Sequence, residues 1–377
     1  MRATLADASL ARYAGQFVWL ELNFDKPDNQ AFLARHGVMY TPSFFVIDPA
    51  DERTTATQIG GMTLPELTQF LDHGEHGVIG KAGMPADAAL ARGDELLAHG
   101  QHAEAAAAYR EALRSGGGTW PQRGRAVGSV TWALMLSGQS QACAETASTE
   151  AVHMTRGQMF GRVVLAGVMC VNQGRPAPWA EGARKTLEPL AEEAIALPAT
   201  LRDHRFQLYQ QLMHDAEARG DKATLARWGD RWLNELEATR PANEDERSAL
   251  DIARVDAASF LGAASRVLPA LIASERAMPN NYNASLRLAQ MEIEAKQYDE
   301  AIAACDRGLE HVSGPLGRTW LFETKADALT QSGQPSEARR VLDEALQSAQ
   351  AIGVKQARDH NIERISSAIK ELQKAAK

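Results

Sequence analysis

The chain has 377 residues, of which 45% are hydrophobic and 23% charged, and its formal net charge is −8. A chain of this length and composition can bury sizeable cores, and we expect two folding units rather than one. The 40 basic and 48 acidic residues form no long run of one sign, so no nucleic-acid partner is expected. No apolar run approaches the ~20 residues that span a bilayer. We therefore expect no membrane insertion, and the oligomeric state stays open.

Residues 1–76 alternate between the patterns of strands and helices. Runs of aromatic and β-branched side chains that end at Asp, Pro or Gly predict strands. The predicted strands are residues 17–24, 43–47 and 54–59.

Helices are expected between and around these strands. Residues 3–13 carry part of a helical pattern, and a short helix is expected at 29–36, closed by Gly37. Thr63 has a glutamate three residues later, which is the spacing of a capping box. This spacing predicts a last helix that runs to about Leu71.

The order of strand, helix, proline turn, two strands and helix resembles the C-terminal two-thirds of a thioredoxin fold. In that resemblance Thr41 and Pro42 form the turn with a cis proline, and the backbone before the proline pairs with an extended substrate. The Cys-x-x-Cys motif of the family is missing. The resemblance therefore implies an incomplete thioredoxin-like domain at 1–76, with Thr41 and Pro42 as substrate- or peptide-binding residues and no catalytic residue.

Two explanations for the missing motif stay open. Either the domain has become a non-catalytic module, or Met1 is an internal methionine and a Cys-x-x-Cys lies upstream of it. The second is preferred because the pattern breaks in the middle of a helix. The chain as given is expected in the cytoplasm, and a full-length chain with an upstream signal peptide is expected in a bacterial periplasm.

Residues 73–85 are rich in glycine and lack periodicity, which predicts a domain boundary with a linker at 77–85. Gly80 and Lys81 superficially match a phosphate loop, but the first glycine and the Ser or Thr of that motif are missing. His73 and His76 are a weak metal signal without a third ligand. We expect no metal and no cofactor.

The three cysteines, Cys143, Cys170 and Cys305, are far apart within helical patterns. This spacing is typical of neither a disulfide framework nor a zinc site. The sequence predicts that all three are small buried hydrophobic residues.

From residue 86 to residue 350 apolar residues recur at spacings of three and four, which predicts helices of about a dozen residues. Ala88 to Gly118 has small and large residues in an order that resembles a tetratricopeptide repeat of 34 residues. Two further good copies are expected at 281–313 and 318–350, with degenerate copies between them. Residues 351–377 predict a capping helix.

The predicted fold is therefore mainly α: a tetratricopeptide-like solenoid of helix pairs, preceded by a small incomplete α/β domain. In this resemblance the first helix of each pair lines a concave face that binds peptides. The candidate residues on that face are Asp94, Asn283, Arg287, Gln290, Trp320, Glu323 and Asp327.

Other residues are weaker candidates for binding. Trp179, Trp228 and Trp232 are of the type favoured at binding hot spots, but the last two are four residues apart on one helix face and are expected in the core. His204 and His214 are expected at the surface.

The leading hypothesis is a non-enzymatic scaffold that binds a protein or peptide on the solenoid. The alternative is a thiol:disulfide oxidoreductase or redox chaperone whose cysteines lie upstream of Met1. No set of nucleophile, base and acid emerges from the sequence, so an enzyme is not expected from the chain as given.

Overall fold

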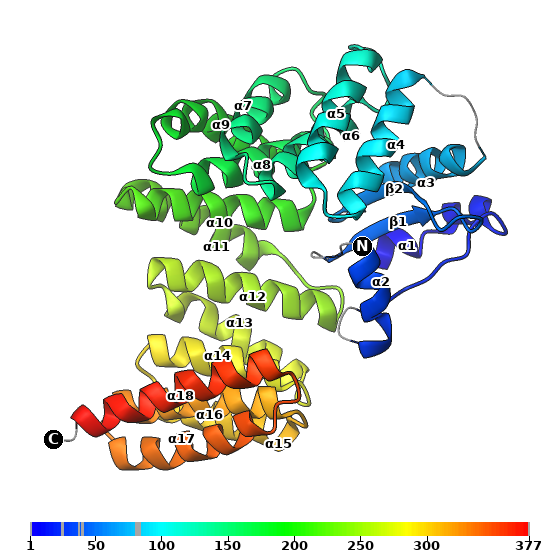
Figure 1. The fold of residues 1–377 in the computed structure, drawn as a ribbon. Helices are drawn as coiled ribbons and strands as arrows, with labels where there is room; N and C mark the ends of the chain where they lie inside the picture. The colour runs from blue at the N-terminus through cyan, green and yellow to red at the C-terminus, as the bar shows by residue number, and fades with distance from the viewer. Residues whose placement is uncertain (1, 24–25, 37, 39–40, 80–83, 376–377) are drawn as a thin grey trace. The chain divides into compact units, whose positions relative to one another are not determined.

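The computed structural model describes residues 2–23, 26–36, 38, 41–79 and 84–375 (Figure 1). The chain forms two compact units, Met1–Asp215 and Ala216–Lys377. The structure is mainly helical with one small sheet, which confirms the predicted fold class. The expected linker at 77–85 does not separate the two units, because residues 1–76 share the first unit with the first helix pairs.

The first unit begins with short elements and one hairpin. The strands β1 and β2 pair antiparallel, with Ser43 opposite Ile59 and Phe45 opposite Thr57. Both strands have the bounds that the sequence predicts. The elements are α1 (Arg2–Leu5), η1 (Ala8–Tyr13), η2 (Pro27–Asn29), α2 (Gln30–Arg35), β1 (Ser43–Ile47), β2 (Thr54–Ile59) and α3 (Leu64–Val78).

The strand predicted at residues 17–24 is wrong for the part that the structure describes. Residues 17–23 have no regular structure, and the side chains of Val18 and Leu20 are 88% and 77% exposed. A strand forms only when a neighbouring strand accepts its backbone hydrogen bonds. Within the described residues β1 pairs only with β2, so the apolar pattern of residues 17–23 finds no partner. The expected cap at Gly37 lies outside the described residues.

Helix α3 begins as predicted but ends later. Thr63 and Glu66 form the capping box, and the helix continues to Val78 instead of ending near Leu71. A Cβ atom on Gly74 would lie 2.6 Å from Val46 of β1, and one on Gly77 would lie 2.9 Å from Thr55 of β2. The glycines that predict a linker therefore let α3 pack closely on the hairpin.

Helices α4 to α9 follow one another as helix–turn–helix pairs in the first unit, and α12 to α17 do so in the second. Helices α10 and α11 lie between these two sets in the chain, and the degenerate copies keep the same pattern of two helices and a short turn. The helices are α4 (Pro85–Ala98) and α5 (His102–Gly116), α6 (Arg123–Leu136) and α7 (Ser140–Ala151), α8 (Gln158–Gly174) and α9 (Pro178–Ala196), α10 (Arg202–Ala218), α11 (Lys222–Ala238), α12 (Glu244–Leu261) and α13 (Ala264–Ala277), α14 (Tyr282–Glu294) and α15 (Tyr298–His311), and α16 (Pro315–Gln331) and α17 (Pro335–Gln350).

Small residues hold the two helices of a pair close together. A Cβ atom on Gly93 of α4 would lie 2.5 Å from the ring of Tyr109 on α5, and both Tyr109 and Ala105 are fully buried. The turn inside several pairs uses a left-handed residue, as Gly100 and Gly333 show with φ of 72° and 81°. Lys296 takes this place between α14 and α15, with φ of 62°.

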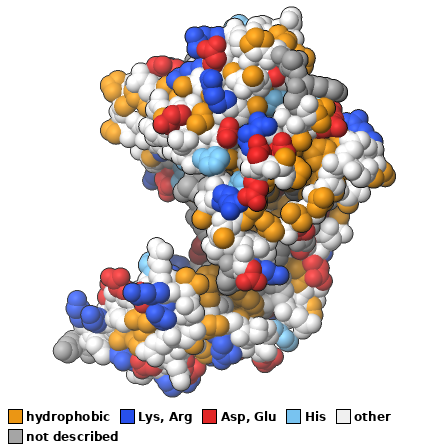
Figure 2. Space-filling model, turned by 45° about the vertical axis from the view of Figure 1, so that its right-hand side comes forward, with side chains coloured by type: hydrophobic (Ala, Val, Ile, Leu, Met, Phe, Trp, Pro, Cys, Tyr) orange, Lys and Arg blue, Asp and Glu red, His pale blue; other side chains and the backbone are white. Residues whose placement is uncertain are grey.

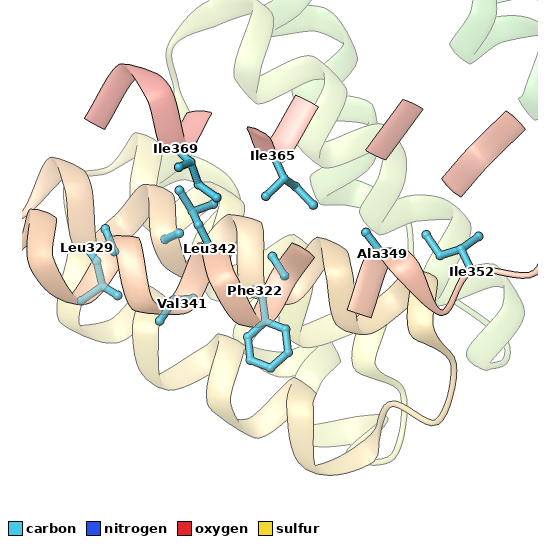
Figure 3. Close-up of a cluster of buried hydrophobic side chains, with 11 residues drawn as sticks. Phe322, Leu329, Val341, Leu342, Ala349, Ile352, Ile365 and Ile369 are labelled. Atoms are coloured by element: carbon cyan, nitrogen blue, oxygen red, sulfur yellow. The ribbon is translucent and has the colours of Figure 1, made fainter. Parts of the chain in front are cut away.

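The second unit ends in the helix α18 (Lys355–Ala375). Ile365 and Ile369 of this helix point into a cluster with Phe322 of α16 and Leu342 of α17 (Figure 3). The helix thus covers the apolar face of the last pair. None of the described helices is both long enough and apolar enough to span a membrane. On the face drawn in Figure 2, acidic and basic side chains are interspersed.

The cysteine prediction is partly wrong. Cys143 of α7 and Cys170 of α8 form a disulfide, with their Cα atoms 6.2 Å apart. Cys305 of α15 is a free, buried thiol, as expected. A separation of 27 residues in sequence says nothing about distance in space, and it is the packing of α7 against α8 that brings the two sulfur atoms together.

Candidate functional site

The second unit has a hollow of about 980 Å³ formed by the first helices of three pairs and by α18. We call it the hollow. Its lining residues are Val255 and Ser259 of α12; Asn283, Leu286, Arg287, Gln290, Met291, Ile293 and Glu294 of α14; Lys296; Trp320, Glu323, Thr324, Asp327 and Gln331 of α16; and Arg364 of α18.

Six of the seven residues predicted for a concave face line this hollow. They come from α14 and α16, where spacings of three and four place side chains on one helix face. They are Asn283, Arg287, Gln290, Trp320, Glu323 and Asp327. The sequence therefore identified which residues share a surface, and their role in binding stays a prediction.

The sequence reasoning missed the contributions of α12 and α18. Val255 and Ser259 are four residues apart on one face of α12. The repeat pattern there is too degenerate to show which face of the helix lines the concave side. Arg364 lies in the stretch 351–377 that the sequence predicts to be a capping helix. Only its position beside α16 brings it to the hollow.

Most acidic groups of the hollow already have partners. The Arg364 guanidinium donates to both carboxylate oxygens of Glu323, at 2.9 Å for the Nε donor. Burial raises the pKa of Glu323, and Arg364 opposes this shift. Asp327 accepts from the amide of Gln331 at 3.0 Å, and Glu294 accepts from the hydroxyl of Ser259 at 2.6 Å.

Arg287 differs from Asp327 and Glu294 because it is half-buried whereas they are exposed, and it has no ionic partner. Its half-buried side chain donates only a long hydrogen bond to Ser248 Oγ, at 3.4 Å. Among the described residues no carboxylate oxygen lies within 4.0 Å of its guanidinium. Burial lowers the pKa of Arg287, and the charge of Asp251 opposes the shift. Asp251 itself is buried and paired with Arg254 at 2.7 Å.

Trp320 gives the hollow an apolar surface. Its side chain is 37% exposed, whereas Leu286 and Met291 of α14 are almost fully buried at the base. A large aromatic side chain that stays exposed among polar groups is typical of binding hot spots. The hollow therefore combines a basic group, amide groups and one aromatic platform.

The seventh predicted residue, Asp94, is not on an open surface, so that prediction is wrong. The Asp94 side chain is 0% exposed, binds the guanidinium of Arg125 and accepts from the Tyr109 hydroxyl at 2.8 Å. Burial raises the pKa of Asp94, while Arg125 and Tyr109 oppose that shift. The Nε2 atom of His73 lies 3.9 Å from the carboxylate, and burial lowers the pKa of this histidine to about 3.

Asp94 is buried because the N-terminal part of the chain covers the first helices of the first unit. The Thr57 carbonyl of β2 accepts from Arg125 of α6 at 3.1 Å, and the Phe70 ring of α3 lies 5.8 Å from the same guanidinium. Figure 1 shows β2 and α3 beside α4. Here the chain fills a surface that the second unit leaves open.

The contacts continue along α8. The backbone N–H of Thr63 donates to Gln158 Oε1 at 3.0 Å. Burial lowers the pKa of Arg162 to about 10, and the Glu66 carboxylate opposes the shift. Residues of α4, α6 and α8 that would otherwise face solvent thus become the buried floor under β2 and α3.

Thr41 and Pro42 lie in the first unit, in the bend before β1, and both are exposed. Their peptide bond is cis. The Pro42 carbonyl accepts from the N–H of Gly60 at 2.8 Å, which ties the bend to the end of β2. Their role in binding a peptide stays a prediction.

The remaining candidates are mostly structural. Trp228 and Trp232 are buried in the core, as expected, and Trp179 packs against Gly174. The prediction of a surface position is wrong for His204, whose burial lowers its pKa to about 4, and right for His214.

The described residues contain no group of three or more His, Cys, Asp or Glu side chains that could hold a metal ion. The phosphate-loop resemblance at Gly80 and Lys81 lies outside the described residues.

A family model for the tetratricopeptide repeat matches residues 83–136 and 252–315. The two matched stretches are thus similar to tetratricopeptide repeats. They comprise α4 to α6, and part of α12 with α13 to α15; of the latter, α12 and α14 line the hollow. The family match thus supports the repeats predicted at 88–118 and 281–313, while the thioredoxin-like part at 1–76 stays a prediction.

Two solved structures share a distant likeness. A tetratricopeptide repeat protein from Parabacteroides merdae is 11% identical, with 74% of this chain and 98% of that chain covered and a TM-score of 0.41. The complex of the TPR2AB domain of yeast Sti1 with pHSP90 is 16% identical, with the same coverage and a TM-score of 0.27. At these TM-scores the likeness supports no functional argument. No curated protein matches the chain at a significant level.

Proposed function

We propose that the protein is an interaction scaffold whose hollow binds a peptide or an extended segment of a partner protein. The observation that carries this proposal is the convergence of α12, α14, α16 and α18 on one hollow. Its lining offers amide groups for a partner's backbone, an exposed tryptophan and an arginine without an ionic partner. Such a lining suits an extended chain, which presents backbone groups and side chains together.

The N-terminal residues have a different proposed role. We infer that β2 and α3 form a non-catalytic module that fills the surface of α4, α6 and α8 and keeps it from partners. The contacts of Thr57, Phe70 and Thr63 with α6 and α8 support this role. Its thioredoxin-like ancestry is part of the same proposal and rests on the sequence resemblance.

The compartment is also a proposal. The disulfide between Cys143 and Cys170 supports an oxidising compartment, because such bonds are rare in the reducing cytosol. This favours the periplasmic alternative over the cytoplasmic one.

Site-specific cross-linking tests the binding proposal. The photo-cross-linking residue p-benzoylphenylalanine replaces Trp320 in the hollow or Gln347, an exposed residue of α17 outside the hollow. Illumination in the source cells is expected to give discrete cross-linked products from position 320 and not from position 347. Equal patterns from the two positions would count against the hollow as the binding surface.

A further inference from the structure

We propose that the hollow recognises an acidic side chain within an extended partner segment, with Arg287 binding the carboxylate and Trp320 contacting an adjoining apolar side chain. This inference rests on the proposed function and adds the chemistry of the partner. It follows from the charge balance of the hollow, from the contacts of the first unit and from the spacing of residues on α14.

Among the charged residues of the lining, Arg287 is the half-buried one without an ionic partner, because Asp327 and Glu294 are exposed to water. Glu323 is paired with Arg364, and Asp327 and Glu294 each accept a hydrogen bond from a neutral neighbour. Arg287 has only the hydroxyl of Ser248. A half-buried cation without a counter-ion has lost hydration without gaining an ionic contact. A carboxylate from a partner would restore that contact, with the paired hydrogen bonds that a guanidinium favours.

Lys296 strengthens the preference for an acidic partner. It lies at the end of α14 and is exposed, and no ion pair within 4.0 Å is found for it among the described residues. Arg287 and Lys296 outnumber Glu294, the carboxylate on the same side of the hollow, and this excess of one positive charge favours the approach of an acidic segment.

The first unit shows how this chain satisfies an arginine on its first helices. Arg125 of α6 binds the carboxylate of Asp94, donates to the backbone carbonyl of Thr57 and lies against the ring of Phe70. The carbonyl and the ring come from the segment that covers the helices. In the second unit no carboxylate of the described residues lies within 4.0 Å of Arg287, which leaves this contact open to a partner.

The spacing on α14 indicates that the acidic residue lies inside a segment rather than at its end. Asn283 and Gln290 flank Arg287 by four and three residues on the same helix. With a rise of 1.5 Å per residue they are about 10 Å apart along the helix, which is the length of about three residues of extended chain. The two amides can therefore bond the partner backbone before and after a residue held by Arg287.

Selection from a peptide library tests the inference. Random dodecapeptides are displayed on phage with their C-termini fused to the coat protein, so that only side-chain carboxylates can be selected, and are enriched on the immobilised full-length protein. The expected consensus is an Asp or Glu beside an aliphatic or aromatic residue. One selected peptide is then made with acetylated and amidated ends, and its affinity is measured by fluorescence polarisation.

Substitutions in the protein and in the peptide test whether Arg287 contacts the acidic side chain of the peptide. Arg287→Gln is expected to weaken the peptide about tenfold, and replacing the peptide's acid by its amide is expected to do the same. The two changes together should cost little more than either alone, as required when two groups contact each other. Arg276→Gln removes the same charge from an exposed position on α13 outside the hollow and should leave the affinity unchanged. Melting temperatures of all variants show that binding losses do not reflect unfolding.

The outcomes distinguish this inference from the proposed function. Selected peptides that lack acids, and that bind Arg287→Gln normally but bind Trp320→Ala and Asn283→Ala weakly, overturn the inference and leave the hollow as the binding site. Peptides that are indifferent to all three variants overturn both. Failure to enrich any peptide also counts against both. An acidic consensus with the expected coupling to Arg287 supports both.

Discussion

The two units use the first helices of their repeats in opposite ways. In the first unit β2 and α3 cover α4, α6 and α8, and charged residues such as Asp94 and Arg125 become buried, paired parts of the core. In the second unit α12, α14 and α16 line an open hollow in which Arg287 has no ionic partner. The comparison teaches that a charged residue on this helix face is structural or available to a partner according to what covers it.

The sharpest test of this comparison removes one arginine from each unit. Arg125→Met leaves the Asp94 carboxylate buried without its counter-ion, and we expect a loss of about 3–5 kcal/mol in the free energy of unfolding. Arg287→Met removes an unpaired cation and should change stability by no more than ~0.5 kcal/mol. Urea unfolding measures both values.

Hydrogen exchange locates the effect of these two variants. Faster exchange in peptides from residues 54–78 and 123–136 of Arg125→Met would place the damage in the covered surface. Equal, small losses in the two variants would contradict a structural role for the buried pair.

The disulfide is the second difference, since it joins helices of the first unit alone among the described residues. The double variant Cys143→Ala, Cys170→Ala is expected to lower the free energy of unfolding by about 3–4 kcal/mol. The reason is that the bond restricts the unfolded chain, and its removal gives the unfolded state more conformational entropy. The matched control is Cys305→Ala, which removes a buried thiol of the second unit without a bond.

Mass spectrometry checks the bond itself. After alkylation of the denatured, non-reduced protein, one thiol should be modified, and three after reduction. Three modified thiols without reduction would show that the bond does not form.

Close packing of α3 on the hairpin is tested with two glycines. Gly74→Ala places a methyl group against Val46, at a Cβ distance of 2.6 Å, and should destabilise the first unit by about 1–3 kcal/mol. Gly182→Ala, in α9 with open space around the Cβ position, should stabilise by about 0.5–1 kcal/mol through helix propensity. Thermal melts of the two variants should therefore shift in opposite directions. A neutral Gly74→Ala would show that α3 is a loosely attached linker.

The smallest effect depends on pH and belongs to the second unit. Glu292 of α14 is 5% exposed, and burial raises its pKa to about 7. The folded state therefore holds this proton more tightly than the unfolded state, so ionisation of Glu292 costs stability as pH rises from about 4.5 to 7. Glu292→Gln should leave stability unchanged below pH 4.5 and raise it by roughly 1–2 kcal/mol above pH 7. Chemical unfolding of both proteins across this range measures the difference, and a gain of the same size at every pH would refute the assigned ionisation.

The sequence predicted those parts of the fold whose signals are local. The bounds of β1 and β2 and the capping box at Thr63 follow from neighbouring residues. The helix pairs follow from small residues such as Gly93 and Ala105, which must face a neighbouring helix. In the candidate site, spacings of three and four on α14 and α16 placed six residues on one surface.

The errors arose where a residue's role depends on distant parts of the chain. Residues 17–23 have the apolar pattern of a strand but no strand beside them. Gly74 lies in a glycine-rich stretch that is typical of a linker, but in the structure it lets α3 pack closely against Val46. Arg364 reached the hollow only because α18 packs against α16 and α17.

The amino-acid sequence by itself determined the repeats, the hairpin and the helix faces, because periodicity and capping act over a few residues. Only the tertiary structure decided which of these faces is covered, which cysteines meet and which charges are paired. The physical reason is that burial and ion pairing depend on contacts between residues far apart in the chain. In the sequence Asp94 and Arg287 are both charged residues predicted on the first helix of a pair. The segment of β2 and α3 buries Asp94, whereas Arg287 lines an open hollow where a partner can contact it.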